Sequence, residues 1–176
     1  MKCRLLNHRI SISTVSVLIL MLTCLSIPVH GAQLEIYQDP ARPDFSLADL
    51  KGELHTLGKY KGSVVVINFW ASWCLPCIKE MPDLQKLKEN FAQRSFEVIT
   101  INVGERKHRI EKFTRRIKLE LPVLLDSNSA TFNAWNLKIL PGSFIIDKDG
   151  VFRYLVYGDP GWDDEANLEL IEGLLK

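Results

Sequence analysis

Two cysteines spaced as Cys74-Leu75-Pro76-Cys77 carry the clearest chemical signal in this chain. The residues after Cys74 have helical periodicity, so Cys74 should stand at the start of a helix. Backbone N–H groups and the helix dipole favour a thiolate at that position. We therefore predict that Cys74 is the exposed attacking thiol and that Cys77 is the buried thiol that resolves a mixed disulfide.

Other uses of the two cysteines fit the sequence less well. A zinc site needs two further ligands, but residues 32–176 hold no other cysteine, and their histidines, His55 and His108, lack metal-ligand spacing. A purely structural disulfide would add little stability, because the loop that it closes is very short. We expect a redox-active pair that requires no metal and no other cofactor.

The elements that must position this pair can be predicted from hydrophobic periodicity. Val64–Trp70 (VVVINFW) is almost entirely apolar, which indicates a central strand, parallel to a neighbour and buried on both faces. A helix follows over Cys74–Phe91, where Pro82 should introduce a kink. Phe96–Val103 is the next strand, so the three segments form a βαβ unit with a right-handed crossover.

The remaining elements predict an α/β fold of three layers, with a mixed central sheet and helices on both faces. They are a hairpin of Phe45–Leu47 and Leu54–Leu57, a basic helix over Arg109–Lys118, a strand over Leu121–Leu125, a short helix over Ser127–Trp135 capped by Ser127 or Asn128, antiparallel strands over Ser143–Ile146 and Val151–Tyr157, and a last helix from Asp163 or Asp164 to Leu175.

Three segments, VVVINFWASWCLPCIKEMPDL, PVLLD and ILPGSFIIDKDGV, resemble the TlpA/ResA/DsbE-like branch of the thioredoxin superfamily. The resemblance runs from about Phe45 to the C-terminus. It implies a thioredoxin-like three-layer fold with an N-terminal β-hairpin and the activity of an exported, often membrane-tethered thiol-disulfide oxidoreductase. Many members are reductants, commonly in c-type cytochrome maturation. The implied partners are protein disulfide substrates and an upstream electron donor, either a membrane protein or a thioredoxin-type protein.

The resemblance also implies roles for residues outside the cysteine pair. Pro141 matches the cis-proline of the family, which faces the cysteines in space. Leu140 would then offer backbone groups to a substrate segment by strand addition. Trp73 would shield the thiols at the rim of the substrate-binding site. Gly142 departs from the glutamate that the DsbE members for cytochrome maturation often carry after this proline.

A proton carrier for the thiols can be sought among nearby acids. Thioredoxins place a buried aspartate on the central strand, where this chain has Asn68, which cannot hold a proton at working pH. Glu80 lies three residues after Cys77, on the same helical face, and no basic residue follows one turn later to pair with it. In resemblance to ResA-like proteins, we expect Glu80 to exchange protons with the thiols.

Two alternative functions use related chemistry. Copper-binding chaperones on this fold have a wider Cys-x-x-x-Cys motif with a partner histidine, and no histidine lies near Pro141 in this sequence. Peroxiredoxin-like antioxidants need Thr or Ser three residues before the catalytic cysteine, and this chain has Ala71 there. Both functions stay open as alternatives, and disulfide exchange is preferred.

Residues 1–31 form a separate segment, with Lys2, Arg4 and Arg9 but no acid, followed by an apolar stretch over Ile10–Val29. This pattern indicates a secretory signal peptide, although the stretch is also just long enough to remain as a membrane anchor. Either case places the folded part in the periplasm or on the outer face of the cytoplasmic membrane. Residues 32–44 should be an extended tether, and residues 45–176 the thioredoxin-like domain.

The composition supports a single globular domain and argues against some partners. The chain has 176 residues, of which 47% are hydrophobic and 24% charged, so wholesale disorder is excluded. A net charge of +1 removes the electrostatic argument for nucleic-acid binding.

Overall fold

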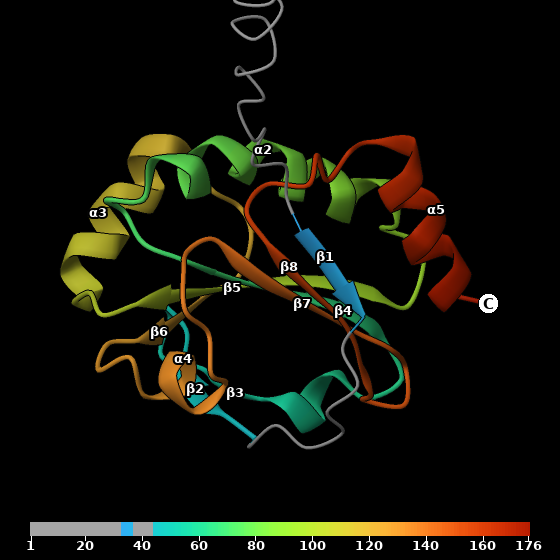
Figure 1. The fold of residues 1–176 in the computed structure, drawn as a ribbon. Helices are drawn as coiled ribbons and strands as arrows, with labels where there is room; N and C mark the ends of the chain where they lie inside the picture. The colour runs from blue at the N-terminus through green and yellow to red at the C-terminus, as the bar shows by residue number, and fades with distance from the viewer. Residues whose placement is uncertain (1–32, 37–43) are drawn as a thin grey trace, which may run out of the picture. The chain divides into compact units, whose positions relative to one another are not determined.

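A computed structural model describes residues 33–36 and 44–176, which lie within the unit Gly31–Lys176. A six-stranded sheet with the order β1-β8-β7-β4-β5-β6 runs through this unit, and β2 and β3 form a separate hairpin (Figure 1). The strands are β1 (Gln33–Ile36), β2 (Ser46–Ala48), β3 (Leu54–Thr56), β4 (Val64–Trp70), β5 (Phe96–Val103), β6 (Val123–Asp126), β7 (Gly142–Ile146) and β8 (Phe152–Tyr157). The helices are η1 (Leu57–Tyr60), α2 (Leu75–Asn90), α3 (Lys107–Ile117), α4 (Ala130–Ala134) and α5 (Glu165–Leu174).

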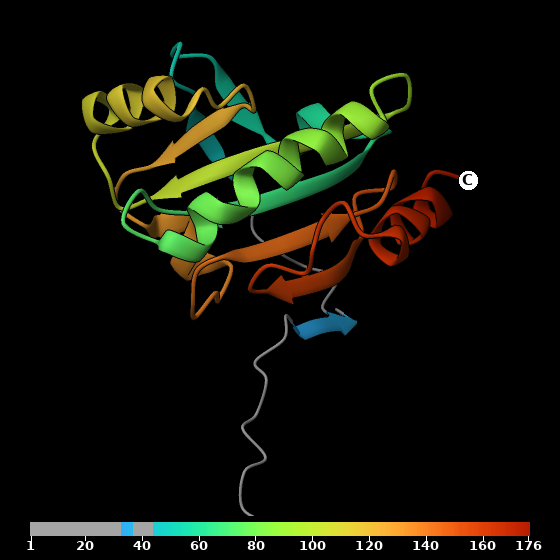
Figure 2. The ribbon, with the colours of Figure 1, turned by 90° about the horizontal axis from the view of Figure 1, so that it is seen from above.

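The sheet is mixed, as the sequence predicts. β4 and β6 are both parallel to β5, whereas β7 is antiparallel to β4 and to β8. All seven residues of β4 are buried, which confirms that Val64–Trp70 is a central strand. α2 connects β4 to the parallel strand β5 and continues through Pro82, so the βαβ unit is also confirmed (Figure 2).

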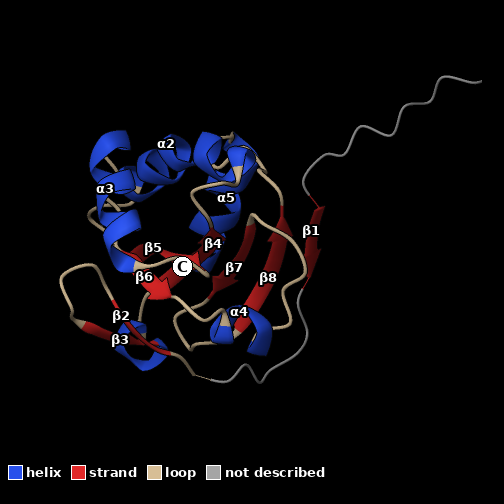
Figure 3. Ribbon diagram, turned by 90° about the vertical axis from the view of Figure 1, so that its left-hand side faces the viewer, coloured by secondary structure: helices blue, strands red, loops and turns tan. Residues whose placement is uncertain are grey.

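The sheet separates two apolar clusters, and different elements cover its two faces (Figure 3). α2, α3 and α5 cover one face. The short helix α4, η1 and the β2–β3 hairpin cover the other, where the rings of Trp135, Phe144 and Phe152 pack with centroids 5.2–5.5 Å apart. The predicted three layers are confirmed, although the second helical layer is much thinner than the first.

The N-terminus of α4 differs from the prediction. The helix begins at Ala130 with Ser129 as its N-cap residue, and the Ser129 side chain makes no capping hydrogen bond. Asn128, one of the two predicted caps, still contributes, because its Oδ1 accepts a hydrogen bond from the Ala130 N–H at 3.1 Å. The buried Asp126 carboxylate accepts hydrogen bonds from the backbone N–H groups of Thr131 and Phe132, at 3.2 and 2.9 Å. Two side chains that precede the N-cap residue therefore satisfy the first N–H groups of α4.

The segment before the domain contains a strand that the sequence did not predict. Gln33–Ile36 forms β1, an edge strand that pairs antiparallel with β8, so that Leu34 lies opposite Val156. Residues 37–43 and the leader, including its signal or anchor stretch, lie outside the described residues. Among the described residues, no helix is long and apolar enough to cross a membrane.

Candidate active site

Cys74 and Cys77 form a disulfide at the N-terminus of α2, with an Sγ–Sγ distance of 2.02 Å. Cys74 is the N-cap residue, and its Sγ accepts a hydrogen bond from the backbone N–H of Cys77 at 3.3 Å. Pro76 lies in the first helical turn, where the missing N–H costs no helical hydrogen bond. The predicted position of Cys74 at a helix start is confirmed.

The surroundings of the two sulfurs correct one expectation. Cys74 is only 5% exposed in this oxidised form, so the prediction that it is exposed is wrong here, although Cys77 is fully buried. The Cys74 sulfur turns inward over the first turn of α2, toward Cys77 and its N–H. Its neighbours in sequence point outward, because Trp73 is 68% and Leu75 62% exposed.

The Leu140–Pro141 peptide bond is cis, as the resemblance implies. Leu140 packs against the apolar cluster that contains both cysteines, and the Pro141 carbonyl accepts a hydrogen bond from Gly158 at 3.0 Å. The departure at Gly142 has a steric reason. A Cβ atom there would lie 2.9 Å from the Leu137 side chain and 3.3 Å from the carbonyl oxygen of residue 139.

Glu80 is completely buried on α2, one turn after Cys77. Its Oε1 accepts a hydrogen bond from Asn68 Nδ2 at 2.8 Å, and its Oε2 accepts one from Trp162 Nε1 at 3.0 Å. Asn68 Nδ2 also donates to Ser143 Oγ at 2.9 Å. Burial raises the pKa of Glu80 to about 8, even though these two hydrogen bonds lower it. The carboxyl group can therefore be charged or neutral near neutral pH.

Sequence reasoning missed the partners of Glu80. Trp162 lies 82 residues further along the chain, and Ser143 lies on β7 beside Asn68 of β4. The signal that could have found Trp162 is a lone aromatic residue within the polar stretch Gly158–Glu165.

A second buried acid, also missed from sequence, holds the loop that leads to Cys74. Glu105 accepts hydrogen bonds from the backbone N–H and the hydroxyl of Ser72, both at 2.6 Å, and from Asn102 at 2.9 Å. It also pairs with Arg109 at 2.9 Å. Burial alone would raise the pKa of Glu105, but the hydrogen bonds from Asn102 and Ser72 outweigh it and lower the pKa. Glu105 is therefore an anionic anchor for the loop.

The structure also gathers three metal-ligating side chains that the sequence analysis did not connect. The ligand atoms of Asp49, Glu53 and His55 lie within 4.8 Å of one another in the β2–β3 hairpin. These groups already have partners, because His55 contacts Asp49 at 3.7 Å and hydrogen-bonds Tyr60 through Nδ1, while Glu53 pairs with Lys59. These contacts to Lys59 and Tyr60 explain the three side chains as a polar cluster that links the β2–β3 hairpin to η1.

Comparisons with known proteins agree with this geometry. Residues 39–155 match the model of the AhpC/TSA family. The thiol-disulfide oxidoreductase ResA of Geobacillus kaustophilus is 40% identical over 131 residues, which cover 74% of this chain and 75% of that protein. ResA of Geobacillus thermodenitrificans is 34% identical over 94% of this chain and 98% of its own length.

The chain belongs to the TlpA/ResA/DsbE-like branch of the thioredoxin superfamily. A solved structure of the same type, assigned as the thiol:disulfide interchange protein DsbE of Chlorobium tepidum, superimposes with a TM-score of 0.73 at 29% identity. The superposition covers 81% of this chain and the whole of the Chlorobium tepidum chain. Membership in this branch and the Cys74–Cys77 pair together make the protein a thiol-disulfide oxidoreductase that works by dithiol–disulfide exchange.

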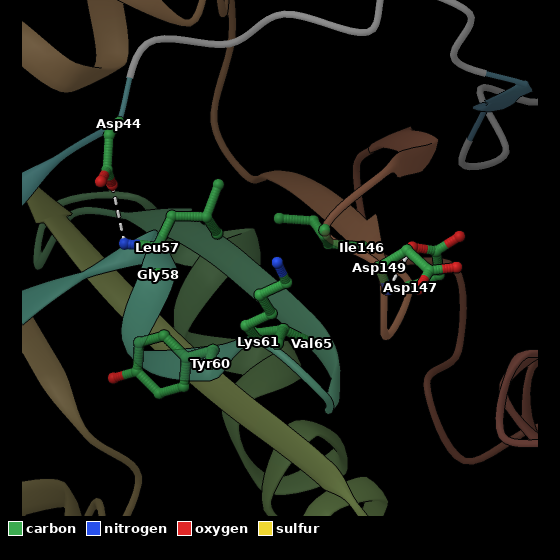
Figure 4. Close-up of a pocket in the computed structure, with 10 residues that line it drawn as sticks. Asp44, Leu57, Gly58, Tyr60, Lys61, Val65, Ile146, Asp147 and Asp149 are labelled. Atoms are coloured by element: carbon green, nitrogen blue, oxygen red, sulfur yellow. Dashed lines mark hydrogen bonds between the residues drawn. The ribbon is translucent and has the colours of Figure 1, made fainter.

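A further hollow of about 250 Å³ lies between η1 and the β7–β8 turn (Figure 4). Two of the three carboxylates that line it serve local structure: Asp44 accepts a hydrogen bond from the Leu57 N–H, and Asp147 pairs with Arg153. Neither cysteine nor Pro141 lines it. The exchange chemistry of this TlpA/ResA/DsbE-like protein therefore lies outside this hollow.

Proposed function

We propose that the protein is an exported reductant of protein disulfides, with Cys74 as the attacking thiol and Cys77 as the resolving thiol. The observation that carries this proposal is the position of the pair. Cys74 caps α2 and is the less completely buried of the two cysteines, while Cys77 lies fully buried one turn before a buried acid. This arrangement supports one reactive thiolate and one protected thiol.

Reduction of a substrate then proceeds in two exchanges. The Cys74 thiolate attacks one sulfur of the substrate disulfide, so that a mixed disulfide forms and the other substrate sulfur leaves as a thiolate. Cys77 loses its proton and attacks Cys74 Sγ, which releases the second substrate thiolate. The two electrons come from the cysteine pair, which ends as the disulfide seen in the structure.

Glu80 acts in this scheme as the base that takes the proton from Cys77. With a pKa of about 8, its charged form is present in a useful fraction near neutral pH, and it still holds a proton well enough to return it. Its position one turn after Cys77 and its complete burial support this role, because water has little access to either group.

The substrate is bound beside the pair by Trp73, Leu140 and Pro141. The exposed Trp73 ring gives apolar contact area, and the backbone of Leu140, at the entrance to β7, pairs with an extended segment of the substrate. Leu75 and Ile139 are also largely exposed and extend the apolar rim. A rim of this kind suits partly unfolded protein segments.

The cellular setting follows from the leader and the relatives. The positive, then apolar segment over residues 1–31 supports export, with cleavage or with retention as a membrane tether. Membership in the TlpA/ResA/DsbE-like branch supports a place in c-type cytochrome maturation, where the substrate would be a disulfide that the protein reduces to a thiol pair. A membrane or thioredoxin-type donor would return the pair to its reduced state.

Trapping of mixed disulfides in the native host tests the proposal. In the Cys77→Ser variant, Cys74 can attack a substrate but no thiol remains to resolve the mixed disulfide. This variant should therefore accumulate substrate adducts that dithiothreitol reduces and releases. The matched Cys74→Ser variant should collect few. Stronger trapping by Cys74→Ser would overturn the assignment of the attacking thiol.

The direction of electron flow needs a second measurement. Alkylation of the native protein in intact cells should find the pair largely reduced, and a largely oxidised pair would contradict the reductant role. Copper titration and peroxide turnover of the purified protein test the two alternative functions. Tight copper binding or rapid peroxide reduction would favour the corresponding alternative.

A further inference from the structure

Positive charge is concentrated on α3 and its flanks. Residues 106–118 contain seven Lys and Arg residues and one acid, Glu111, which leaves 15 basic and 20 acidic residues in the rest of the chain. All seven basic side chains are exposed. We call them the α3 ridge: Arg106, Lys107, Arg109, Lys112, Arg115, Arg116 and Lys118.

Most of this charge lacks an acidic partner, and Arg116 lies instead over the Phe113 ring, 5.1 Å from its centroid. Within the part of the chain that the structure describes, Lys107 lies 3.8 Å from Glu111 and Arg109 pairs with Glu105, but the other five cations have no carboxylate within ion-pair distance. Lys112 and Arg116 stand four residues apart, where like charges destabilise a helix. A helix that served only to cover the sheet would gain stability from acids at these positions.

The α3 ridge borders the loop that carries the cysteines. One hollow of about 270 Å³ is lined by Ser72, Arg109, Lys112 and Arg116, together with Phe113. A second hollow of about 410 Å³ is lined by Trp73, Glu105, Arg106 and Arg109, together with Gly104 and His108. Arg109 lines both hollows, and its Nε also donates to Ser72 Oγ at 3.2 Å. The two hollows thus begin beside the two residues that precede Cys74.

We propose that the α3 ridge binds an acidic segment of the substrate protein, close to the disulfide that Cys74 attacks. This inference rests on the proposed function, since it specifies the class of substrate that the exchange site accepts. Neither cysteine lines these hollows, but a ligand in them would touch Ser72 and Trp73, the two residues that directly precede Cys74. Anionic lipid would supply the same charge but no disulfide at that position, and we therefore favour an acidic protein segment.

Electrostatic attraction should act mainly on the encounter of the two proteins. Unpaired surface charge can raise the association rate of an oppositely charged partner by about 10- to 1,000-fold at low salt, and added salt removes the gain. We expect a preference for acidic over neutral substrates of about tenfold at low ionic strength, at the lower end of that range.

Three synthetic peptides test the proposal with the reduced full-length protein. They share one disulfide-closed loop and differ in flanking residues, which are Asp and Glu, Ser and Gln, or Lys. The rate constant for each peptide is divided by that for 2-hydroxyethyl disulfide, an uncharged small substrate, so that the chemistry itself cancels. The ratio should fall in the order acidic, neutral, basic, and the differences should disappear at about 0.5 M salt, where screening is nearly complete.

Charge reversal provides the matched comparison. Lys112→Glu with Arg116→Glu should abolish or invert the preference. Lys51→Glu with Lys61→Glu changes the net charge equally at exposed positions that line neither hollow, and should preserve it. Equal ratios for the three peptides, or equal effects of the two double variants, would overturn the proposal.

Two further outcomes would each refute a different part of the scheme. A protein that reacts with neither the peptides nor 2-hydroxyethyl disulfide would contradict the proposed function itself, and not only the role of the α3 ridge. Binding to vesicles of anionic phospholipid that is lost in the Lys112→Glu, Arg116→Glu variant, with peptide preference unchanged, would assign the ridge to a membrane surface and refute the substrate proposal.

Discussion

Replacement of Glu80 by glutamine should change how the stability of the oxidised protein depends on pH. The folded protein holds the pKa of Glu80 at about 8, compared with an ordinary value of 4.5. Each pH unit of such a difference corresponds to about 1.4 kcal/mol. Complete ionisation of this buried carboxyl therefore lowers the free energy of unfolding by about 5 kcal/mol, an order-of-magnitude figure.

The sign follows from proton binding. Between pH 4.5 and about 8 the native state binds the Glu80 proton more tightly than the unfolded chain does, so stability falls as pH rises. The stabilising contribution is complete below pH 4.5 and is lost by the time the pH has passed about 8. At pH 7 the loss should already be about 3 kcal/mol.

Glutamine fits the site without this titration. It can accept from Trp162 through its oxygen, and Asn68 can rotate its amide so that Oδ1, which is buried and has no hydrogen-bond partner in the described structure, accepts from the new amide group. The difference in unfolding free energy, Glu80→Gln minus wild type, should therefore grow from pH 5 to about pH 8 and level off by pH 9.

Urea unfolding of the oxidised proteins, followed by circular dichroism at pH 5, 6, 7, 8 and 9, measures this difference, and oxidation keeps the thiols from titrating. Glu120→Gln removes an exposed carboxylate and is the matched control, for which the difference should stay nearly constant. Parallel stability curves for wild type and Glu80→Gln would refute the reasoning, because Glu80 would then titrate as it does in the unfolded chain.

Four further outcomes are expected. Limited alkylation of the reduced protein with peptide mass mapping should label Cys74 before Cys77, and the reverse order would contradict the assigned roles. Glu105→Ala leaves a backbone N–H and a hydroxyl before Cys74 without their acceptor, so chemical denaturation should show a loss of about 1–3 kcal/mol. Gly142→Ala forces close contacts and should cost about 1–3 kcal/mol in the same assay, whereas Gly173→Ala, inside α5 with open space around it, should stabilise by about 0.5–1 kcal/mol. An unchanged free energy of unfolding for Gly142→Ala would show that the surrounding groups can move to accommodate the added methyl group.

Much of this protein could be predicted from local sequence. Val64–Trp70 is apolar at every position except Asn68, which is typical of a strand covered on both faces, and the structure buries every residue of it. The helical period after Cys74 placed the cysteine pair at a helix start, and the three-residue spacing placed Glu80 one turn from Cys77. Each of these inferences depends on geometry within one or two adjacent elements.

Tertiary structure decided the features that join distant segments. The hydrogen-bond partners of Glu80 come from β4 and from the loop after β8, and only the sheet order and the packing of α2 bring them to one point. Glu105 holds Ser72 because β4 and β5 are parallel neighbours, so the loops that follow them meet at one edge of the sheet. For the same reason α3, which follows β5, lies near Trp73, which follows β4. Periodicity describes which face of an element is apolar, but not which element will cover it, and these contacts therefore had to be read from the folded chain.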